Sequence, residues 1–393
     1  MQEIKSKYLE KIEKELKQRF AGEGEIRFFR APGRVDWLGS HTDYNFGLIL
    51  ASTVDREIFA GARLRDDGVL NLYSINLDME VRINIEQNSP DPAHSWANYP
   101  KGVIAQLKER GIEISGMDLV FYGDVPIGAN LSSSAALEAV TLEAVVGFLN
   151  CQLSLWERAF ICFYAENKFV GMPCGILDQF TIYMGGENSV LFLDCDRLSS
   201  ERIEVDFEKV QLLVVDSGVG RELVKSEYSK RREECEKAFQ EICSLGYKIR
   251  HLSELSSSDL ADIEGKINPL LFRRVRHIIT ENERVKKAKE LIKSKDYKSL
   301  GELLNQGYYS SSRDYENSIY ELDLLFELLS KTDAVLGARI AGAGWGGCMV
   351  ALVENFSPEE FEATVKEPYE KKTQKSLRYF LVKTSSSPGE IDA

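Results

Sequence analysis

The sequence predicts a protein of mixed α/β class, and three observations support this. Residues 116 to 150 run from the strand-like segment MDLVFYG through a Gly/Ser loop into the apolar helical segment AALEAVTLEAVVGFL. Three further segments, SVLFLDCD, QLLVVDSG and CMVALVE, are typical of buried strands, and the stretch from 226 to 329 is mostly helical and charged. At 393 residues the chain is long for a single hydrophobic core. Its length therefore favours two domains or one large α/β domain.

The remaining elements can be assigned in chain order. The first 20 residues place Ile4, Tyr8, Ile12 and Leu16 four apart between charges, which predicts an amphipathic helix and not a signal peptide. The segment EIRFFRAPGRVDWLG predicts a short strand broken by its Pro-Gly pair, and LILASTVDREIFAGARLR is β-rich. A further helix is expected at about 155–169.

The domain boundary is placed near residue 200. Beyond this point helical content and charge both rise. We therefore predict an N-terminal domain of residues 1–200 and a C-terminal domain of residues 201–393.

Composition limits the classes of partner. The formal net charge of -13 argues against a broad nucleic-acid surface and against binding to anionic membranes, and no segment approaches the apolar length of a membrane span. The seven cysteines are scattered without a CxxC pair, which favours reduced thiols and a cytoplasmic protein. The four histidines show no spacing typical of a zinc site. Any phosphate must therefore bind at a local site.

A candidate for that local site is the segment PIGANLSSSA at residues 126–135. It places small residues and hydroxyls directly before a helix, whose N-terminal N–H groups and positive dipole end attract anions. The alternative is that Ser133 or Ser134 only caps the helix. The chain has no GxxxxGK[ST] motif and no HRD or DFG set, so it is neither a P-loop nucleotidase nor a protein kinase.

A second candidate site is the polar segment GRVDWLGSHTDYN at residues 33–45. Sugar recognition needs many converging hydrogen-bonding groups on a rigid loop, since each buried hydroxyl left unpaired costs about 1 to 3 kcal/mol. Without further information a polar surface turn explains this composition equally well.

Both segments resemble signatures of one family. The pattern APGRVxxxGxHTDYNxG is similar to the galactokinase signature, and PIGANLSSSA resembles the motif PxGxGLSSSA of the GHMP kinases, with Asn130 where that motif has glycine. The segments WANYPKGVI, GMPCGILDQF, SEYSKRREECE and AGAGWGGC match the same family in order. The resemblance implies a two-domain GHMP kinase fold with the active site in the interdomain cleft. It also implies an ATP-dependent sugar 1-kinase that forms galactose 1-phosphate.

The resemblance assigns roles residue by residue. Asp178 matches the catalytic base and Arg34 the arginine that pairs with it, while Ser134 and Glu166 match the ligands of Mg²⁺. An arginine beside the base would keep it ionised and weaken its basicity. Trp96 is expected near adenine, with a place in the core as the alternative. The sugar contacts implied are Ser40, His41, Thr42, Asp43, Gly175 and Tyr228, and the nucleotide contacts are Gly128, Ala129, Asn130, Leu131, Ser132, Ser133 and Ser134.

One departure bears on the substrate. The signature ordinarily has glutamate at position 40, where it contacts the C6 hydroxyl of galactose, and this chain has Ser40. Galactose is the first expectation, and galacturonate or another sugar altered at C6 is the alternative, for which Arg221 could supply a cation. Asp36 and Trp37 stand where the family commonly has asparagine and an aliphatic residue, and Ala51 stands where proline is usual. A non-catalytic sugar sensor is disfavoured because the phosphate loop, Asp178 and Arg34 are intact. The protein is expected to be a monomer.

Overall fold

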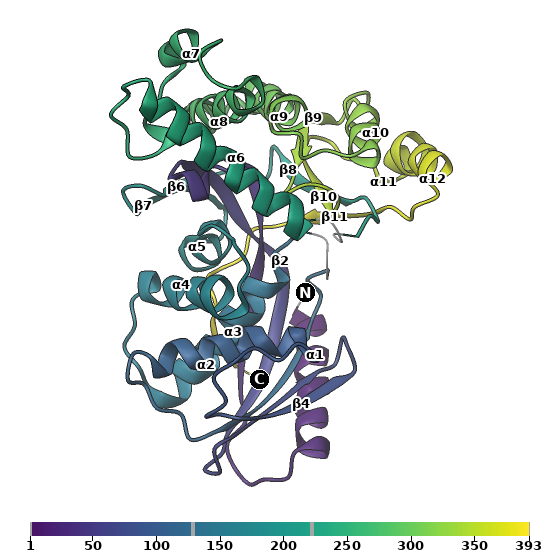
Figure 1. Ribbon diagram of the computed structural model, residues 1–393. Helices are drawn as coiled ribbons and strands as arrows, with labels where there is room; N and C mark the ends of the chain where they lie inside the picture. The colour runs from purple at the N-terminus through teal and green to yellow at the C-terminus, as the bar shows by residue number, and fades with distance from the viewer. Residues whose placement is uncertain (1, 127–129, 221–223, 393) are drawn as a thin grey trace.

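The computed structural model describes residues 2–126, 130–220 and 224–392. The chain forms two bodies of mixed α/β structure, one above the other in Figure 1, and the long strand β2 (Leu48–Leu64) runs up from the lower body. The last segment of the chain descends from the upper body to the lower one. The two-domain α/β expectation is confirmed.

The N-terminal body contains an eight-stranded sheet. Its main path has the order β12-β1-β2-β5-β3-β4, with β6 paired to β2 and β7 paired to β6. All neighbours are antiparallel except β3 and β5. The other strands are β1 (Arg27–Leu38), β3 (Val69–Ser74), β4 (Met79–Asn84), β5 (Met117–Gly123), β6 (Ser189–Asp194), β7 (Ser199–Glu204) and β12 (Gly389–Ile391).

Helices cover both faces of this sheet. The predicted N-terminal helix is α1 (Gln2–Arg19), which buries Ile12 and Leu16 against Phe28 and Phe59 and leaves Ile4 exposed. The second face carries α2 (Asn98–Lys108), α3 (Ser133–Leu149), α4 (Leu155–Tyr164) and α5 (Leu177–Met184), with the short turn η2 (Ser95–Ala97) and the π-helical turn η3 (Ala165–Val170). The short turn η1 (Asp43–Asn45) follows β1, and its Tyr44 packs against the cluster formed mainly by α6 (Val224–Ser244) and α8 (Pro269–Lys293). Burial of apolar surface on both faces accounts for the predominantly apolar strands.

The C-terminal body contains a four-stranded antiparallel sheet of order β11-β8-β10-β9. Its strands are β8 (Gln211–Asp216), β9 (Val335–Ile340), β10 (Cys348–Val353) and β11 (Arg378–Val382). Its helices are α6 (Val224–Ser244), α7 (Ser257–Ile263), α8 (Pro269–Lys293), α9 (Tyr297–Ser310), α10 (Tyr320–Leu329), α11 (Pro358–Phe361) and α12 (Glu367–Thr373), with the turns η4 (Leu252–Glu254), η5 (Ser311–Tyr315) and η6 (Glu362–Lys366).

The two bodies share one hydrophobic cluster. It joins Val35, Trp37 and Leu38 of β1 to residues of β8, β10, α8 and α9. Because this packing holds the end of β1 against the C-terminal body, the loop that follows β1 has a fixed position between the two. The predicted boundary at residue 200 remains a prediction. It falls within β7, and β12 returns to the first sheet.

Strand β1 differs from its prediction. It runs unbroken through Pro32 and Gly33, with a register shift against β2 between these two residues. At Gly33 an added Cβ would lie 2.6 Å from the carbonyl oxygen of Leu131. The Pro-Gly pair therefore marks a β-bulge that lets the strand approach the phosphate loop, and not the end of the strand.

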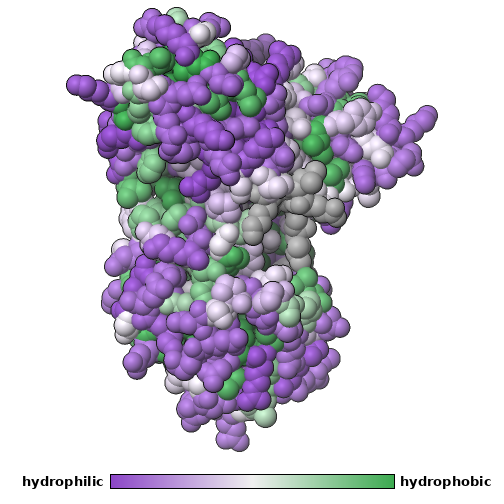
Figure 2. Space-filling model, in the orientation of Figure 1, coloured by the Kyte–Doolittle hydropathy of each residue, from purple (hydrophilic) through white to green (hydrophobic). Residues whose placement is uncertain are grey.

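The face of the molecule seen in Figure 2 is covered mainly by hydrophilic residues on both bodies. Within the described part of the chain, none of the helices combines the length and apolarity that crossing a membrane requires.

Candidate active site

A cleft lies between the two bodies, and both bodies contribute residues to its walls. The N-terminal body supplies the loop after β1, the start of α3, the turn η3 and the segment before α5, and the C-terminal body supplies α6 and the turn between β9 and β10. The lining residues are Arg34, Asp36, Ser40, His41, Asp43, Tyr99, Asn130, Leu131, Ser132, Ser133, Ser134, Glu166, Met172, Pro173, Cys174, Gly175, Leu177, Asp178, Tyr228, Gly342 and Ala343.

Arg34 and Asp178 form an ion pair on one wall of this cleft. Nε and Nη2 of Arg34 donate to Oδ1 of Asp178 at 2.8 and 2.5 Å, and the hydroxyl of Ser132 donates to Oδ2 at 2.5 Å. Arg34 is buried, whereas the Asp178 side chain is 27% exposed. Three donors thus fix the carboxylate of Asp178 while it still faces the cleft. An ionised carboxylate held this way can orient a hydroxyl group more readily than it can remove a proton early.

Helix α3 begins at Ser133, directly beside this pair. Ser132 occupies the N-cap position in the left-handed conformation, with φ of 57°, and its side chain makes no capping hydrogen bond because it points to Asp178. The alternative that Ser133 or Ser134 caps the helix is therefore wrong. The Ser132 side chain thus leaves the first N–H groups of α3 uncapped, and Ser132, Ser133 and Ser134 at the start of this helix line the cleft, as a phosphate site requires. Gly128 and Ala129 lie outside the described residues.

A second group of polar residues lies around Glu166 in η3. The hydroxyl of Ser134 hydrogen-bonds to the Glu166 carboxylate, and Nε2 of Gln179 donates to both Glu166 Oε2 and Glu138 Oε2, at 2.7 and 3.0 Å. Burial, followed by the charge of Asp178, raises the pKa of Glu166 to about 7. Burial and the charge of Glu166 raise the pKa of Glu138 well above its usual range. Ser134 and Glu166 present hard oxygen atoms that could hold a divalent cation.

His41 links the loop after β1 to the C-terminal body. Nε2 lies 2.9 Å from the carbonyl oxygen of Ala343 and Nδ1 lies 3.0 Å from the hydroxyl of Tyr44. Burial lowers the pKa of His41 to about 4, so the ring is neutral at physiological pH. A carbonyl can only accept, so Nε2 carries the proton and Nδ1 accepts from Tyr44. The His41 ring also lies 5.4 Å from that of Tyr228, which brings two predicted sugar contacts together.

Asp43 lies against the segment before α5. Its Oδ2 accepts a hydrogen bond from the backbone N–H of Leu177 at 3.4 Å. A Cβ added to Gly175 would lie 1.8 Å from the same oxygen, so glycine is required at position 175 for this approach. Burial raises the pKa of Asp43 to about 6. Asp43 therefore remains mostly ionised at neutral pH and can accept hydrogen bonds from a ligand in the cleft.

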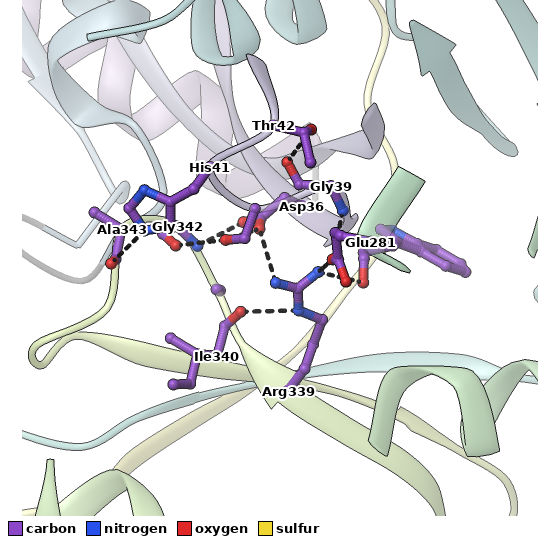
Figure 3. A network of polar contacts seen from close by, with 12 residues as sticks. Asp36, Gly39, His41, Thr42, Glu281, Arg339, Ile340, Gly342 and Ala343 are labelled. Carbon is purple, nitrogen blue, oxygen red and sulfur yellow. Dashed lines mark hydrogen bonds and ion pairs between the residues drawn. The ribbon is translucent and has the colours of Figure 1, made fainter. Parts of the chain in front are cut away.

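Asp36 forms part of a buried polar network that crosses the interface (Figure 3). Ser40 belongs to the same network. The Ser40 hydroxyl lies 2.9 Å from the carbonyl oxygen of Gly342 and 3.3 Å from Asp36 Oδ2, while Asp36 Oδ1 accepts the Gly342 N–H at 2.6 Å. The fully buried Arg339 donates to Glu281 at 2.9 Å, and its Nη2 lies 3.9 Å from Asp36 Oδ2. Burial opposes the charge of Glu281, but Arg284 and Arg339 hold its pKa below the usual range.

Two predicted contacts do not line the cleft. Thr42 is buried, and its hydroxyl is 2.7 Å from the carbonyl oxygens of both Gly39 and Leu48, so it shapes the loop. Trp96 packs edge-on against Phe121 beside the N-terminal core. The structure thus gives Trp96 the core position that was the alternative, and its contact with adenine stays a prediction. Arg221 lies outside the described residues.

Sequence reasoning missed several residues of the cleft. Tyr99, Met172 and Leu177 line it from segments that were recognised only as family matches. Glu138 and Gln179 lie behind Glu166 and were not singled out at all. The available signals were the glutamate at the fifth position after Ser133 and the glutamine next to Asp178, since both are polar residues within apolar helices.

Comparisons with known proteins agree with this geometry. The family described as "GHMP kinases N terminal domain" matches residues 98–186, "GHMP kinases C terminal" matches residues 288–371, and "Galactokinase galactose-binding signature" matches residues 14–64. The galactokinase of Fusobacterium nucleatum is 34% identical over 98% of this chain and 100% of its own length. That of Clostridium tetani is 37% identical over 91% of this chain and 92% of its own.

A solved structure is similar over almost the whole chain. The Lactococcus lactis galactokinase, crystallised with galactose, has a TM-score of 0.92 and 32% sequence identity, and covers 97% of this chain and 98% of its own. The fold and the cleft therefore define a phosphotransferase of the GHMP kinase class, a sugar kinase for which ATP is the phosphoryl donor. Within that class, the chain belongs to the galactokinase family.

Proposed function

We propose that this enzyme transfers the γ-phosphoryl group of ATP to the anomeric hydroxyl of galactose and releases galactose 1-phosphate and ADP. The observation that carries the proposal is the position of Asp178, held by Arg34 and Ser132 beside the N-terminus of α3. This arrangement places a carboxylate that can orient a hydroxyl next to backbone N–H groups that can bind phosphate. The galactose-bound relative from Lactococcus lactis supports the choice of sugar.

The reaction needs an in-line nucleophile and neutralised phosphate charge. The C1 oxygen of the sugar forms the new bond to the γ-phosphorus, and the bond from that phosphorus to the oxygen bridging to the β-phosphate breaks. Asp178 accepts a hydrogen bond from the C1 hydroxyl and takes its proton as the new bond forms. Arg34, buried and permanently charged, stabilises the Asp178 carboxylate and the transferring oxygens.

We assign Ser134 and Glu166 as the residues that would hold Mg²⁺. Their donor chemistry fits, since a hydroxyl and a carboxylate meet there. Burial and the nearby charge of Asp178 raise the pKa of Glu166, and a bound cation would offset this cost of ionisation. A bound Mg²⁺ would supply positive charge to the nucleotide phosphates. Gln179 orients Glu166 through its hydrogen bond at 2.7 Å.

The sugar contacts proposed are Ser40, His41, Asp43, Gly175 and Tyr228. Galacturonate was the alternative because Ser40 replaces a glutamate. However, the fully buried carboxylate of Asp36 lines the same cleft 3.3 Å from the Ser40 hydroxyl. A second anion beside it would be repelled, which favours a sugar that is neutral at C6.

We also propose that the enzyme acts as a cytoplasmic monomer and binds neither nucleic acid nor membrane. The net charge of -13 and the scattered cysteines support this. Sedimentation of the purified protein at several concentrations tests the oligomeric state, and a concentration-dependent sedimentation coefficient would overturn it.

The test of the proposed activity is a panel of sugars with Mg-ATP. Galactose, galacturonate, N-acetylgalactosamine and arabinose are compared by ADP release and by phosphorus NMR of the product. The expected result is the highest kcat/KM for galactose, with the product phosphorylated at C1. ADP release that does not depend on any of these sugars would overturn the proposal, and a preference for galacturonate would overturn the choice of sugar.

A further inference from the structure

The residue that departs from the phosphate-loop motif makes contacts that glycine could not make. Asn130 is buried, with φ of 61°, and its Nδ2 donates to the carbonyl oxygens of Ala341 and Gly346 at 3.0 and 3.4 Å. The same residue's carbonyl oxygen accepts from Nη1 of Arg34 at 2.6 Å. Asn130 thus joins the phosphate loop, the catalytic arginine and the turn between β9 and β10.

That turn, at residues 341–347, is shaped to admit the Asn130 side chain. A Cβ added to Gly347 would lie 2.4 Å from Asn130 Nδ2, and one added to Gly342 would lie 3.1 Å from Asn130 Cγ. Both glycines have positive φ, 77° and 70°. The asparagine and the two glycines are therefore complementary in shape and in hydrogen bonding.

The same turn also supports the part of the cleft that carries the proposed sugar contacts Ser40, His41 and Asp43, which we call the sugar end. The Gly342 N–H donates to Asp36, and the Ala343 carbonyl accepts from His41 (Figure 3). The Gly342 carbonyl accepts from Ser40. One turn of the C-terminal body therefore supports the phosphate loop through Asn130 and the sugar loop through Asp36, Ser40 and His41.

We propose that Asn130 is a positioning residue that fastens the 341–347 turn to the phosphate loop and so holds the sugar-binding residues and Arg34 in one assembly. Without its donor, two carbonyls of the turn lose their partner and the supports of the sugar loop loosen. Loss of these hydrogen bonds should weaken sugar binding even when no nucleotide is bound. This inference uses the proposed function only for its choice of galactose as the probe.

Two substitutions separate hydrogen bonding from volume. Asn130→Gly keeps the left-handed backbone accessible and removes the side chain, while Asn130→Asp keeps the volume and replaces the donor by a carboxylate that faces two carbonyl oxygens. The matched control is Asn150→Gly, because Asn150 also has positive φ, 51°, but is exposed at the end of α3 and does not line the cleft.

The first measurement is hydrogen exchange of peptides spanning residues 338–350 in the ligand-free protein. Loss of one or two such hydrogen bonds predicts exchange about ten-fold faster in both Asn130 variants and unchanged in Asn150→Gly. This readout does not depend on the activity of the enzyme. If the Asn130 side chain only contacted a ligand, the exchange rate would be unchanged in both variants, and this result would overturn the proposal. Exchange at the wild-type rate in Asn130→Asp alone would also overturn it.

The second measurement is galactose affinity by calorimetry without nucleotide. The Kd for galactose is expected to rise about ten-fold in Asn130→Gly and at least as much in Asn130→Asp. Because no ATP is present, repulsion between the new carboxylate and the nucleotide phosphates cannot cause this rise. Unchanged affinity in both variants would overturn the proposed transmission to the sugar loop. If the wild-type protein itself did not bind galactose, the proposed function would fail, while the exchange result would still decide the role of Asn130.

Discussion

The sugar end of the cleft and the proposed metal end, at Ser134, Glu138 and Glu166, are built differently. At the sugar end, both nitrogens of His41, both carboxylate oxygens of Asp36 and the hydroxyl of Ser40 have partners within the protein. At the metal end, Oε1 of Glu138 and Oε1 of Gln179 are buried without a hydrogen-bond partner among the described residues. The sugar end is therefore preorganised by the fold. At the metal end, burial and repulsion from a nearby carboxylate raise the pKa of both Glu138 and Glu166, so ionising both carboxyls is costly in the protein alone, and a bound cation would reduce that cost.

The proposed catalytic pair, Arg34 and Asp178, lies between these two ends, and its removal should have the largest effect. Asp178→Ala removes the acceptor for the C1 hydroxyl, so kcat should fall by at least about 1000-fold. ATP affinity, measured by calorimetry, should change little because the N-terminus of α3 is untouched. Asp178→Asn is the control that keeps the shape and removes the charge. A kcat near that of the wild type in Asp178→Ala would contradict the assignment.

The metal end should respond to Mg²⁺ concentration more than to sugar. In Glu166→Ala the Mg²⁺ concentration for half-maximal activity should rise by about 10 to 100-fold, and in Ser134→Ala by less, because a neutral ligand contributes less than a charged one. Mn²⁺ binding to the protein with ADP, followed by electron paramagnetic resonance, should weaken in parallel. The control is Glu233→Ala, which removes an exposed carboxylate of α6. Equal Mg²⁺ dependence in Glu166→Ala and the control would refute the metal assignment.

Only part of the cleft could be predicted from the sequence. Asp178, Arg34 and Glu166 all line the cleft, and each was singled out because it belongs to a long motif whose order along the chain is specific; their roles stay predictions. Thr42 and Trp96 belong to equally good motifs, yet Thr42 turns to backbone carbonyls and Trp96 to Phe121. A motif indicates that a residue is required at a position, but it does not indicate which way the side chain of that residue points.

Contacts between distant segments were beyond sequence reasoning. The bulge at Gly33 was predicted as a strand break, because the local pattern contains no information about Leu131, which is nearly 100 residues away. Similarly, Asn130 was recognised only as a departure from the motif, and its hydrogen bonds to the 341–347 turn depend on the packing of the two bodies. The α/β class and most helices were local features, and these were confirmed.

The sugar end offers a sharper test of preorganisation at Ser40. Ser40→Glu alone would place a second carboxylate beside the buried Asp36, and two charges at contact cost about 4 kcal/mol at an effective dielectric near 20. This variant should lose thermal stability and gain no galactose affinity.

The double variant Ser40→Glu/Asp36→Asn restores the family pattern and keeps one carboxylate. Its KM for galactose should fall about ten-fold relative to the single Ser40→Glu variant, since a charge-assisted hydrogen bond contributes about 1.5 to 3 kcal/mol. Steady-state kinetics and thermal melts of the four proteins in this cycle measure the coupling between the two sites. Additive effects would mean that Asp36 and Ser40 do not share one subsite.

The smallest expected effect concerns Asp43, a carboxylate at the sugar end whose hydrogen bonds do not offset the cost of its burial. Asp43 has its pKa raised from 3.8 to about 6, chiefly by burial. Between these two pH values the folded protein binds more protons at Asp43 than the unfolded chain does, so this residue's contribution to stability falls as pH rises through the window. Above pH 6 the full cost is present, about 3 kcal/mol at most for a shift of about two units.

Asp43→Asn removes that ionisation and keeps an oxygen that can accept from the Leu177 N–H. The melting temperature of the ligand-free variant should therefore exceed that of the wild type by a few degrees at pH 8, and the difference should shrink towards pH 4.5. Galactose affinity should fall at the same time, because an amide is a weaker acceptor than a carboxylate. A stability difference that did not vary with pH would mean that Asp43 titrates normally in the folded protein.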